Sequence, residues 1–328
     1  MTPGLLQIGL LLWASFAMLT AASIALATPS LRPALRNLAP GLRANVLRAL
    51  LVAPVVGGAS ATFLCFLPKM VGLVAPQLDH CVAHGDHHVH FCPNHPPDAL
   101  FGAAFWIVAG SLALVVGATL VRRASRLRRA RIEANALMRT ADRDGARDVW
   151  VLPTGDPVAL SVGFGDRRTL VSTGLLDRLD DAALDVILAH EDAHRVRRDG
   201  LWRAVTGLLS WTHWPAVARR LEAELEVACE QACDERAAQV VGDRLSVAAT
   251  ILAVARLRTH DGAAHPALLA FGASQLDDRV RALVEDDRRI GLRPGVAPLL
   301  VSATVLSALL LADPLHHVFE TLLHVIAG

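Results

Sequence analysis

The segment from Asp180 to Asp199 reads DDAALDVILAHEDAHRVRRD and contains the motif HExxH, formed by His190, Glu191 and His194. Residues four apart lie on one face of an α-helix, so the two histidines can offer two imidazole nitrogens to one metal ion. Glu191 then stands beside that ion and can take a proton from water. Two neutral nitrogen ligands and a carboxylate base are what zinc-assisted hydrolysis requires.

The residues before the motif predict a helix. Asp180 or Asp181 can cap its N-terminus, and apolar residues recur at helical spacing. These apolar residues are Ala183, Leu184, Ile187, Leu188 and Ala189. The competing interpretation is a chance HExxH on a charged helix face, because a motif match is a hypothesis that needs structural context.

A catalytic zinc site needs a third protein ligand, and the richest supply of acids after His194 is the stretch 222–235, EAELEVACEQACDE. Helical spacing places Glu226, Glu230 and Asp234 on one face. The alternative is a solvated acidic face that pairs with nearby arginines. Cys229 and Cys233 are also four apart and could ligate metal, but they are expected to be small buried packing residues.

Short strands are predicted just before the HExxH helix, at residues 149–153, 158–162 and 169–172, separated by the turn sequences TGDP and GFGD. Residues 134–148 are predicted to form a polar helix. Residues 201–218 are apolar but contain Arg203 and Pro215. They are expected to form a helix at the membrane interface or packed on the spans, with Trp202, Trp211 and Trp214 as anchors.

The composition is that of a membrane protein. Hydrophobic residues make up 53% of the 328 residues, mean hydropathy is +0.41 and the formal net charge is +1. Nothing in this balance indicates direct binding of nucleic acid. Four stretches are long and apolar enough to span a bilayer, namely residues 4–27, 49–68, 101–121 and 295–312. A signal peptide cleaved after Ala27 is the alternative for the first, but the leader has no positive charge.

Arginines predict the orientation of these spans, since short basic flanks stay in the cytoplasm. The segment 29–48 contains four arginines and no acid, and six arginines follow the third span between 122 and 131. The loop 77–100 has no Lys or Arg. We therefore expect a multi-pass protein of the cell's inner (cytoplasmic) membrane with its N-terminus outside. Residues 1–121 would hold three spans, 122–294 the cytoplasmic domain with HExxH, and 295–328 the fourth span and an outer tail.

The outer loop is rich in histidine and cysteine. A disulfide between Cys81 and Cys92 is expected if the loop is exported to an oxidising compartment. The loop could also bind zinc, copper or nickel, or sense acid; the alternative is a polar loop without a dedicated ligand. Its histidines are His80, His84, His87, His88, His90 and His95. A bilayer would separate them from HExxH.

Several motifs together resemble one family, the BlaR/MecR-type antirepressor membrane zinc metallopeptidases, with the HtpX-type membrane proteases as more distant relatives. They are HExxH, the sequence HRVRRD that follows, and the downstream Glu-Gln-Ala-Cys-Asp. The similarity runs from about Val149 to Leu283 and includes GLLDRL, SWTHWP and RVRALV. Position 192 departs from the pattern, because it is Asp where the family usually has an apolar residue.

This resemblance implies a role for each matching residue. His190 and His194 correspond to two ligands of Zn²⁺, Glu230 to the third ligand and Glu191 to the catalytic base. Asp234 corresponds to an acid that holds a ligand imidazole. Only 16 residues follow the last predicted span. The β-lactam sensor domain of the best-known members is therefore expected to be absent, and antibiotic sensing is not carried over.

The expected fold is a mainly α integral membrane protein with about four transmembrane helices and a cytoplasmic, gluzincin-like α+β domain with a small sheet. The expected activity is hydrolysis of a protein or peptide, bound as an extended strand along residues 158–162. The substrate would be a cytoplasmic regulator such as a transcriptional repressor, or the chain itself. Alternatives are membrane-protein quality control of the HtpX kind and a non-catalytic metal-sensing receptor.

The absence of tyrosine limits which group can stabilise a tetrahedral intermediate. A histidine, an arginine or a backbone N–H must do so. The sequence does not choose among the available side chains, which are His213, His260, His265 and Arg279.

Overall fold

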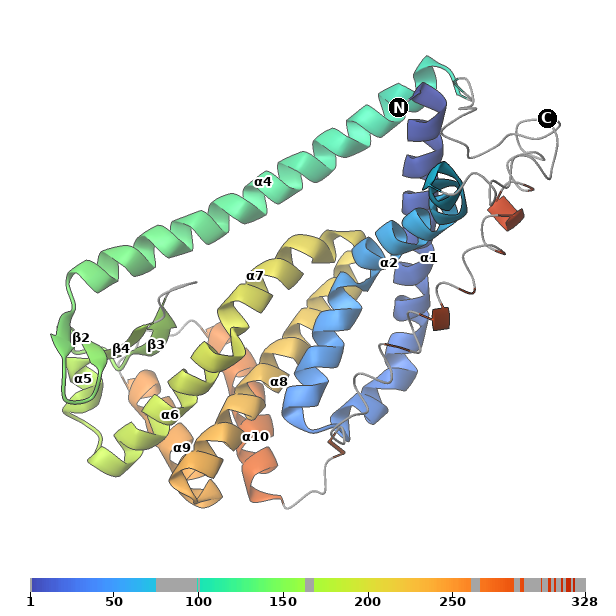
Figure 1. Ribbon diagram of the computed structural model, residues 1–328. Coiled ribbons are helices and arrows are strands. Elements are labelled where there is room, and N and C mark those ends of the chain that lie inside the picture. The colour runs from blue at the N-terminus through green and yellow to red at the C-terminus, as the bar shows by residue number, and fades with distance from the viewer. Residues whose placement is uncertain are drawn as a thin grey trace.

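The computed structural model describes residues 2–74, 99, 101–162, 168–260, 266–285 and 290–291, with scattered positions between 302 and 321. These residues form a mainly helical protein with three candidate membrane helices and one small mixed sheet (Figure 1). The predicted outer loop, 77–100, lies outside the described residues except for position 99. Its six histidines and the predicted Cys81–Cys92 disulfide are therefore not described. Most of the predicted fourth span, 295–312, lies outside them too.

The three candidate membrane helices are α1 (Pro3–Arg36), α2 (Pro40–Val74) and α4 (Ala103–Arg139). α1 and α2 contain the predicted spans 4–27 and 49–68, and α4 begins two residues into the predicted span 101–121; each helix continues beyond the C-terminal end of its span. The reason is that hydropathy marks only the part that suits a bilayer, whereas backbone hydrogen bonds carry the helix on through its polar flank. In α4 this flank holds the six arginines that follow the apolar part.

Helices α1 and α2 pack side by side, whereas α4 diverges from them after its first turns (Figure 1). The start of α4 is fixed to α1 by Gln7, which is fully buried. The Gln7 amide nitrogen donates to the carbonyl of Phe101 at 2.8 Å, and the Phe101 N–H donates back to Gln7 at 3.1 Å. A buried amide in an apolar span is tolerated because these bonds satisfy it.

The sheet has the strand order β1-β2-β4-β3. Its strands are β1 (Asp142–Asp144), β2 (Val149–Leu152), β3 (Ala159–Val162) and β4 (Arg168–Ser172). β2 pairs in parallel with β4, while β1 and β3 are antiparallel to their neighbours. The three strands predicted from the sequence are confirmed to within about a residue at each end, and β3 is an edge strand of the sheet.

The predicted polar helix at 134–148 is only partly correct. Helix α4 ends at Arg139, and residues 142–144 form β1. The carboxylate of Asp144 accepts a hydrogen bond from the Ala146 N–H at 2.9 Å and stabilises the turn that leads into β2. Side-chain bonds of this kind compete with helix, which explains why the polar composition alone was misleading.

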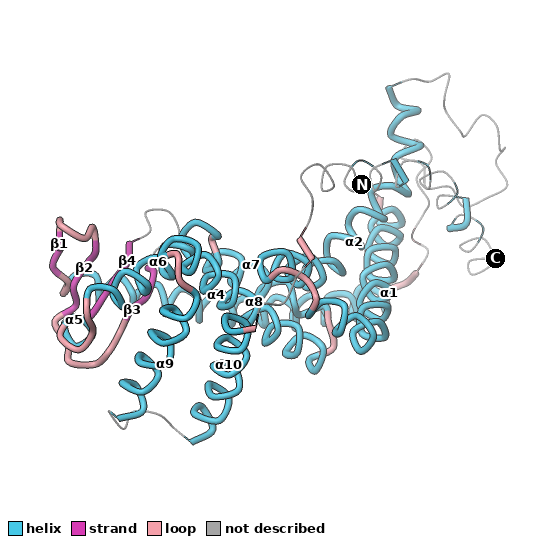
Figure 2. Tube along the Cα trace, turned by 90° about the horizontal axis from the view of Figure 1, so that it is seen from below, coloured by secondary structure: helices cyan, strands magenta, loops and turns pink. Residues whose placement is uncertain are grey.

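The remaining described helices are α5 (Thr173–Leu176), α6 (Asp181–Arg197), α7 (Asp199–Leu209), η2 (Ser210–Thr212), α8 (Pro215–Val241), α9 (Arg244–His260) and α10 (Pro266–Val284). The break before α8 falls at the predicted Pro215, whose ring suits the first helical position. Figure 2 shows the sheet at one end of the molecule and the α1–α2 pair at the other.

Helix α8 connects these two ends. One side packs on the α1–α2 pair, where Leu47, Leu51, Leu221 and Leu225 share a core cluster. Its later turns pack with α6, α9 and α10 through a second cluster that includes Val186 and Ala237. The sheet covers α6 from another direction through Val171 and Ile187. The HExxH helix is therefore enclosed between the sheet and α8.

Candidate metal centre

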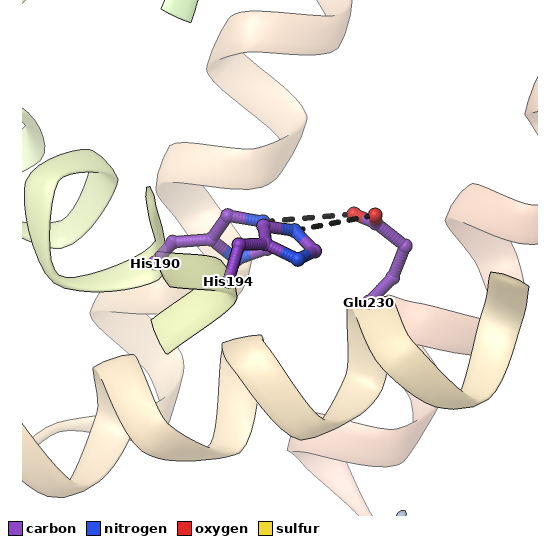
Figure 3. Close-up of side chains that lie close together, drawn as sticks. All are labelled: His190, His194 and Glu230. Atoms are coloured by element: carbon purple, nitrogen blue, oxygen red, sulfur yellow. Dashed lines mark hydrogen bonds and ion pairs between the residues drawn. The ribbon is translucent and has the colours of Figure 1, made fainter. Parts of the chain in front are cut away.

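His190 and His194 lie one turn apart on α6, and Glu230 faces them from α8 (Figure 3). Helix α6 begins where predicted, because the Asp180 carboxylate accepts the Ala183 N–H at 2.8 Å. The two imidazole Nε2 atoms are 3.2 Å apart. The Glu230 carboxylate oxygens lie 3.6 Å from His190 Nε2 and 3.4 Å from His194 Nε2.

These separations fit a zinc ion. Zinc bonds of about 2.0–2.1 Å at tetrahedral angles place neighbouring ligand atoms roughly 3.4 Å apart. The three distances of 3.2, 3.6 and 3.4 Å lie on either side of that value. Two neutral imidazoles and one carboxylate also form a ligand set that catalytic zinc sites use, with one position left for water or substrate. The residues present therefore fit the metal.

The second nitrogen of each imidazole is bound to a buried carboxylate. His190 Nδ1 lies 2.8 Å from Asp234, and His194 Nδ1 lies 2.9 Å from Asp199. The side chains of these acids are only 1% and 4% exposed. An Nδ1–H donated to a carboxylate leaves the Nε2 lone pair directed at the metal position, an arrangement typical of zinc-binding histidines.

Each of these carboxylates is held in turn by arginine. Arg279 of α10 makes a bidentate pair with Asp234, with distances of 2.8 and 2.7 Å. A third nitrogen of Arg279 lies 3.1 Å from Glu230. Asp199 pairs with Arg48 of α2, and Arg197 lies 3.3 Å from the same carboxylate. The centre is thus connected to α10 through Arg279 and to the candidate membrane helix α2 through Arg48.

The electrostatics of the centre favour a cation between ionised acids. Burial raises the pKa of Asp199, but the hydrogen bond from His194 and the charges of Arg197 and Arg48 outweigh it and bring this pKa down to about 2. Burial likewise raises the pKa of Asp234, but the hydrogen bonds and charges of Arg279 and His190 outweigh burial, so that the net shift is downward. The pKa of Glu230 lies well below its usual value, because the two histidines and Arg279 outweigh burial.

The imidazoles respond to the same field. Burial lowers the pKa of His190, but hydrogen bonds to Asp234 and Glu230 outweigh it, so the net shift is upward. Burial also lowers the pKa of His194, and hydrogen bonds to Asp199, Cys233 and Glu230 reverse that effect. The raised pKa values of both histidines show that the surrounding carboxylates stabilise positive charge at this position.

Glu191 points to the side of α6 that faces the sheet. The Ser161 hydroxyl, on edge strand β3, donates to a Glu191 carboxylate oxygen at 2.9 Å and lies 2.8 Å from its backbone carbonyl. The predicted base is therefore oriented by the strand that was predicted to receive substrate. A peptide that extends this sheet would lie beside Glu191.

Other residues singled out in the sequence lie in different places. Cys229 and Cys233 are buried free thiols, as expected for packing residues. Burial raises the pKa of Cys233 to about 11, which keeps it protonated beside Asp199. Glu226 does not join Glu230 at the centre, because it lines a separate cavity one turn earlier on α8.

The structure also separates the four candidates for stabilising a tetrahedral intermediate. Arg279 contacts Glu230 and lies at the centre. His213 is buried elsewhere, with Nε2 3.2 Å from the carbonyl of Leu50. The side chain of His260 and all of His265 lie outside what the structure describes.

Three residues at the centre were missed from the sequence. Asp199 was quoted within HRVRRD but was given no role. Arg198 adopts a left-handed conformation with φ of 57° between α6 and α7, and the chain turns there so that Asp199 meets His194. Arg48 was interpreted only as a positive flank of a span, and Ser161 only as part of a strand. The short spacing from His194 to Asp199 was the one available signal.

A family model described as BlaR1 peptidase M56 matches residues 99–283, which is more than half of the chain. The match includes α4, the sheet, the HExxH helix and Glu230. No curated protein and no solved structure matches the chain significantly.

Proposed function

Because the chain belongs to the BlaR1 peptidase M56 family, a family of membrane metallopeptidases, we propose that it is a zinc endopeptidase that acts in signal transduction. It would cleave a cytoplasmic regulator, such as a transcriptional repressor, or itself. The observation that carries the activity is the convergence of two Nε2 atoms and the Glu230 carboxylate, all within 4.8 Å of one another.

The chain's own residues divide the work as follows. His190, His194 and Glu230 would hold the metal, while Asp234 and Asp199 keep the imidazoles in the required tautomer. A bound zinc ion supplies Lewis acidity, which polarises a peptide carbonyl and lowers the pKa of water. Glu191 accepts the proton from the attacking water and returns it to the leaving amine. Ser161 orients Glu191 for both transfers.

Substrate binding is proposed along β3. This strand pairs with β4 on one side only, so within the described sheet its other edge is available to a peptide backbone. Main-chain hydrogen bonds from an added strand give affinity with little sequence preference. Such binding would bring the scissile bond of an extended segment to Glu191. A compactly folded substrate could not pair with the strand in this way.

The cytoplasmic location of this centre is part of the proposal. It is supported by the arginine-rich flanks of α1, α2 and α4, which the positive-inside rule assigns to the cytoplasm. Quality control of damaged membrane proteins remains the second candidate function, because an edge strand accepts any unfolded segment. Damaged membrane proteins would then be cleaved as readily as a regulator.

The decisive experiment compares wild type, Glu191→Ala and Glu230→Ala in reconstituted membranes, with bound zinc and cleavage of the chain and of casein measured together. We expect Glu191→Ala to keep zinc and lose cleavage, and Glu230→Ala to lose both. Asp192→Ala is the matched control. The Asp192 carboxylate is half-exposed and next to Glu191 in sequence, and within the described part of the chain its ion pair is with Arg195. Cleavage that survives in Glu191→Ala with zinc retained would overturn the role of Glu191 as the base, whereas zinc binding without any cleavage by wild type would leave a metal-binding receptor as the function.

A further inference from the structure

A second arginine-rich region lies on the opposite side of His194 from the metal position. It is a cavity of about 1000 Å³ between α4, α7 and α8, with Arg48 of α2 at its inner end. Six arginines and three acids line it, so it carries an excess of positive charge. The arginines are Arg48, Arg123, Arg126, Arg203, Arg219 and Arg220.

Two of these arginines already have partners. Arg48 pairs with Asp199, and Arg123 donates to the Gly207 carbonyl and to the Ser210 hydroxyl. The other four are exposed, and within the described chain none of them forms an ion pair with a carboxylate. Four unneutralised guanidinium groups around one cavity repel one another unless an anion lies between them.

The rest of the lining is apolar. Leu127 and Ala130 of α4 face Ala204 and Leu208 of α7, and Leu225 of α8 closes the cavity toward the α1–α2 core. A soluble anion would leave this surface wet, whereas an amphipathic anion would cover it. The α4 residues that line the cavity, from Arg123 to Ala130, follow directly on the apolar part of that helix. The positive-inside rule places such a basic flank at the cytoplasmic surface of the bilayer.

We propose that this cavity binds the headgroup and upper acyl chains of an anionic phospholipid from the adjacent leaflet. The phosphate would lie among Arg126, Arg203, Arg219 and Arg220, since a guanidinium fork matches phosphate oxygens. The acyl chains would leave between α4 and α7 along the exposed apolar part of α4. Basic pockets between membrane helices recognise anionic headgroups by the same chemistry.

The test counts lipids that the purified full chain retains from mixed phosphatidylglycerol and phosphatidylcholine bilayers, by native mass spectrometry. Wild type is expected to prefer phosphatidylglycerol by at least about tenfold. The triple variant Arg203→Gln, Arg219→Gln, Arg220→Gln should lose that preference. The matched control, Arg122→Gln, Arg128→Gln, Arg129→Gln, removes the same charge from α4 outside the cavity and should keep it.

Equal loss in both triple variants would overturn the proposal, because the preference would then come from general attraction to the basic flank. Full competition by soluble glycerol phosphate would also overturn it, since the ligand would be a free phosphate. A labelling experiment on the wild-type chain tests the site independently of how the variants fold. Phosphatidylglycerol with a photoreactive acyl chain should label α7 and α8 peptides from residues 202–226, and labelling confined to α1 and α2 would contradict the site.

Discussion

At the scale of single residues, the centre is defined as much by the carboxylates behind the histidines as by the histidines themselves. Asp199 and Asp234 fix which nitrogen of each ring faces the metal, and both stay ionised at neutral pH because their pKa values are lowered. The two acids differ in their own support. Asp234 has a bidentate arginine from α10, whereas Asp199 depends on Arg48 and Arg197.

Asp199→Asn is therefore expected to weaken zinc binding by about 10- to 100-fold, the usual effect of losing the partner of a ligand histidine. The amide has no charge to hold the imidazole Nδ1–H. Competition with a fluorescent chelator measures the affinity, and Asp192→Asn is the control. Unchanged affinity in Asp199→Asn would show that His194 is oriented by α6 alone.

Ser161 gives a second prediction at this scale. Ser161→Ala removes the hydroxyl that holds the Glu191 carboxylate, so kcat should fall by roughly tenfold through poorer proton transfer. Zinc content should not change, because Ser161 contacts no ligand among the described contacts. Ser161→Thr retains a hydroxyl and should recover most of kcat. A rise in KM at constant kcat would instead place Ser161 in peptide binding.

At the scale of elements, the junction between α2 and the centre is the most consequential contact. Arg48 is on a candidate membrane helix, is almost fully buried and pairs with Asp199, 151 positions away. Asp199 contacts His194 directly. Any rotation of α2 that withdraws Arg48 therefore changes the support of a metal ligand without touching the metal.

Arg48→Leu leaves the Asp199 carboxylate buried with Arg197 as its remaining charged partner, and we expect a loss of about 3 kcal/mol in stability. The zinc affinity of Arg48→Leu should also fall when it is measured below the unfolding temperature, where the variant is still folded. Arg48→Lys retains the charge and should be intermediate. The control is Arg36→Leu, an exposed arginine at the end of α1. Normal zinc affinity with reduced stability would show that Arg197 alone maintains Asp199.

At the scale of the whole molecule, the first question is which side of the bilayer each part occupies. Single cysteines introduced at Gly145 and at Pro3, in a background without the native thiols of the outer loop, should react from opposite sides. We expect Gly145→Cys to be labelled only after the cytoplasmic face is opened, and Pro3→Cys in intact cells, as the arginine distribution predicts. Labelling of both from one side would reject this orientation.

The local features of this molecule could be predicted from the sequence, and the long-range ones could not. The helix around His190, its cap at Asp180 and the break before Pro215 follow from spacing and residue type within one segment. The end of α4 at Arg139 was missed, because the polar residues that follow suit a helix as well as a turn. Arg48 of α2 meets Asp199 of α7 only through the packing of α2 on α7 and α8, which no pattern within either segment encodes.

Helix α4 has a mechanical consequence. Its 37 residues extend for roughly 55 Å at 1.5 Å per residue, well beyond a hydrocarbon core of about 30 Å. Only Thr140 and Ala141 separate it from β1, and its side chains are hardly buried. It is therefore a stiff lever: tilting its outer part by about 10° moves the far end by roughly 10 Å. Such a displacement would shift the sheet, and with it Ser161, against Glu191.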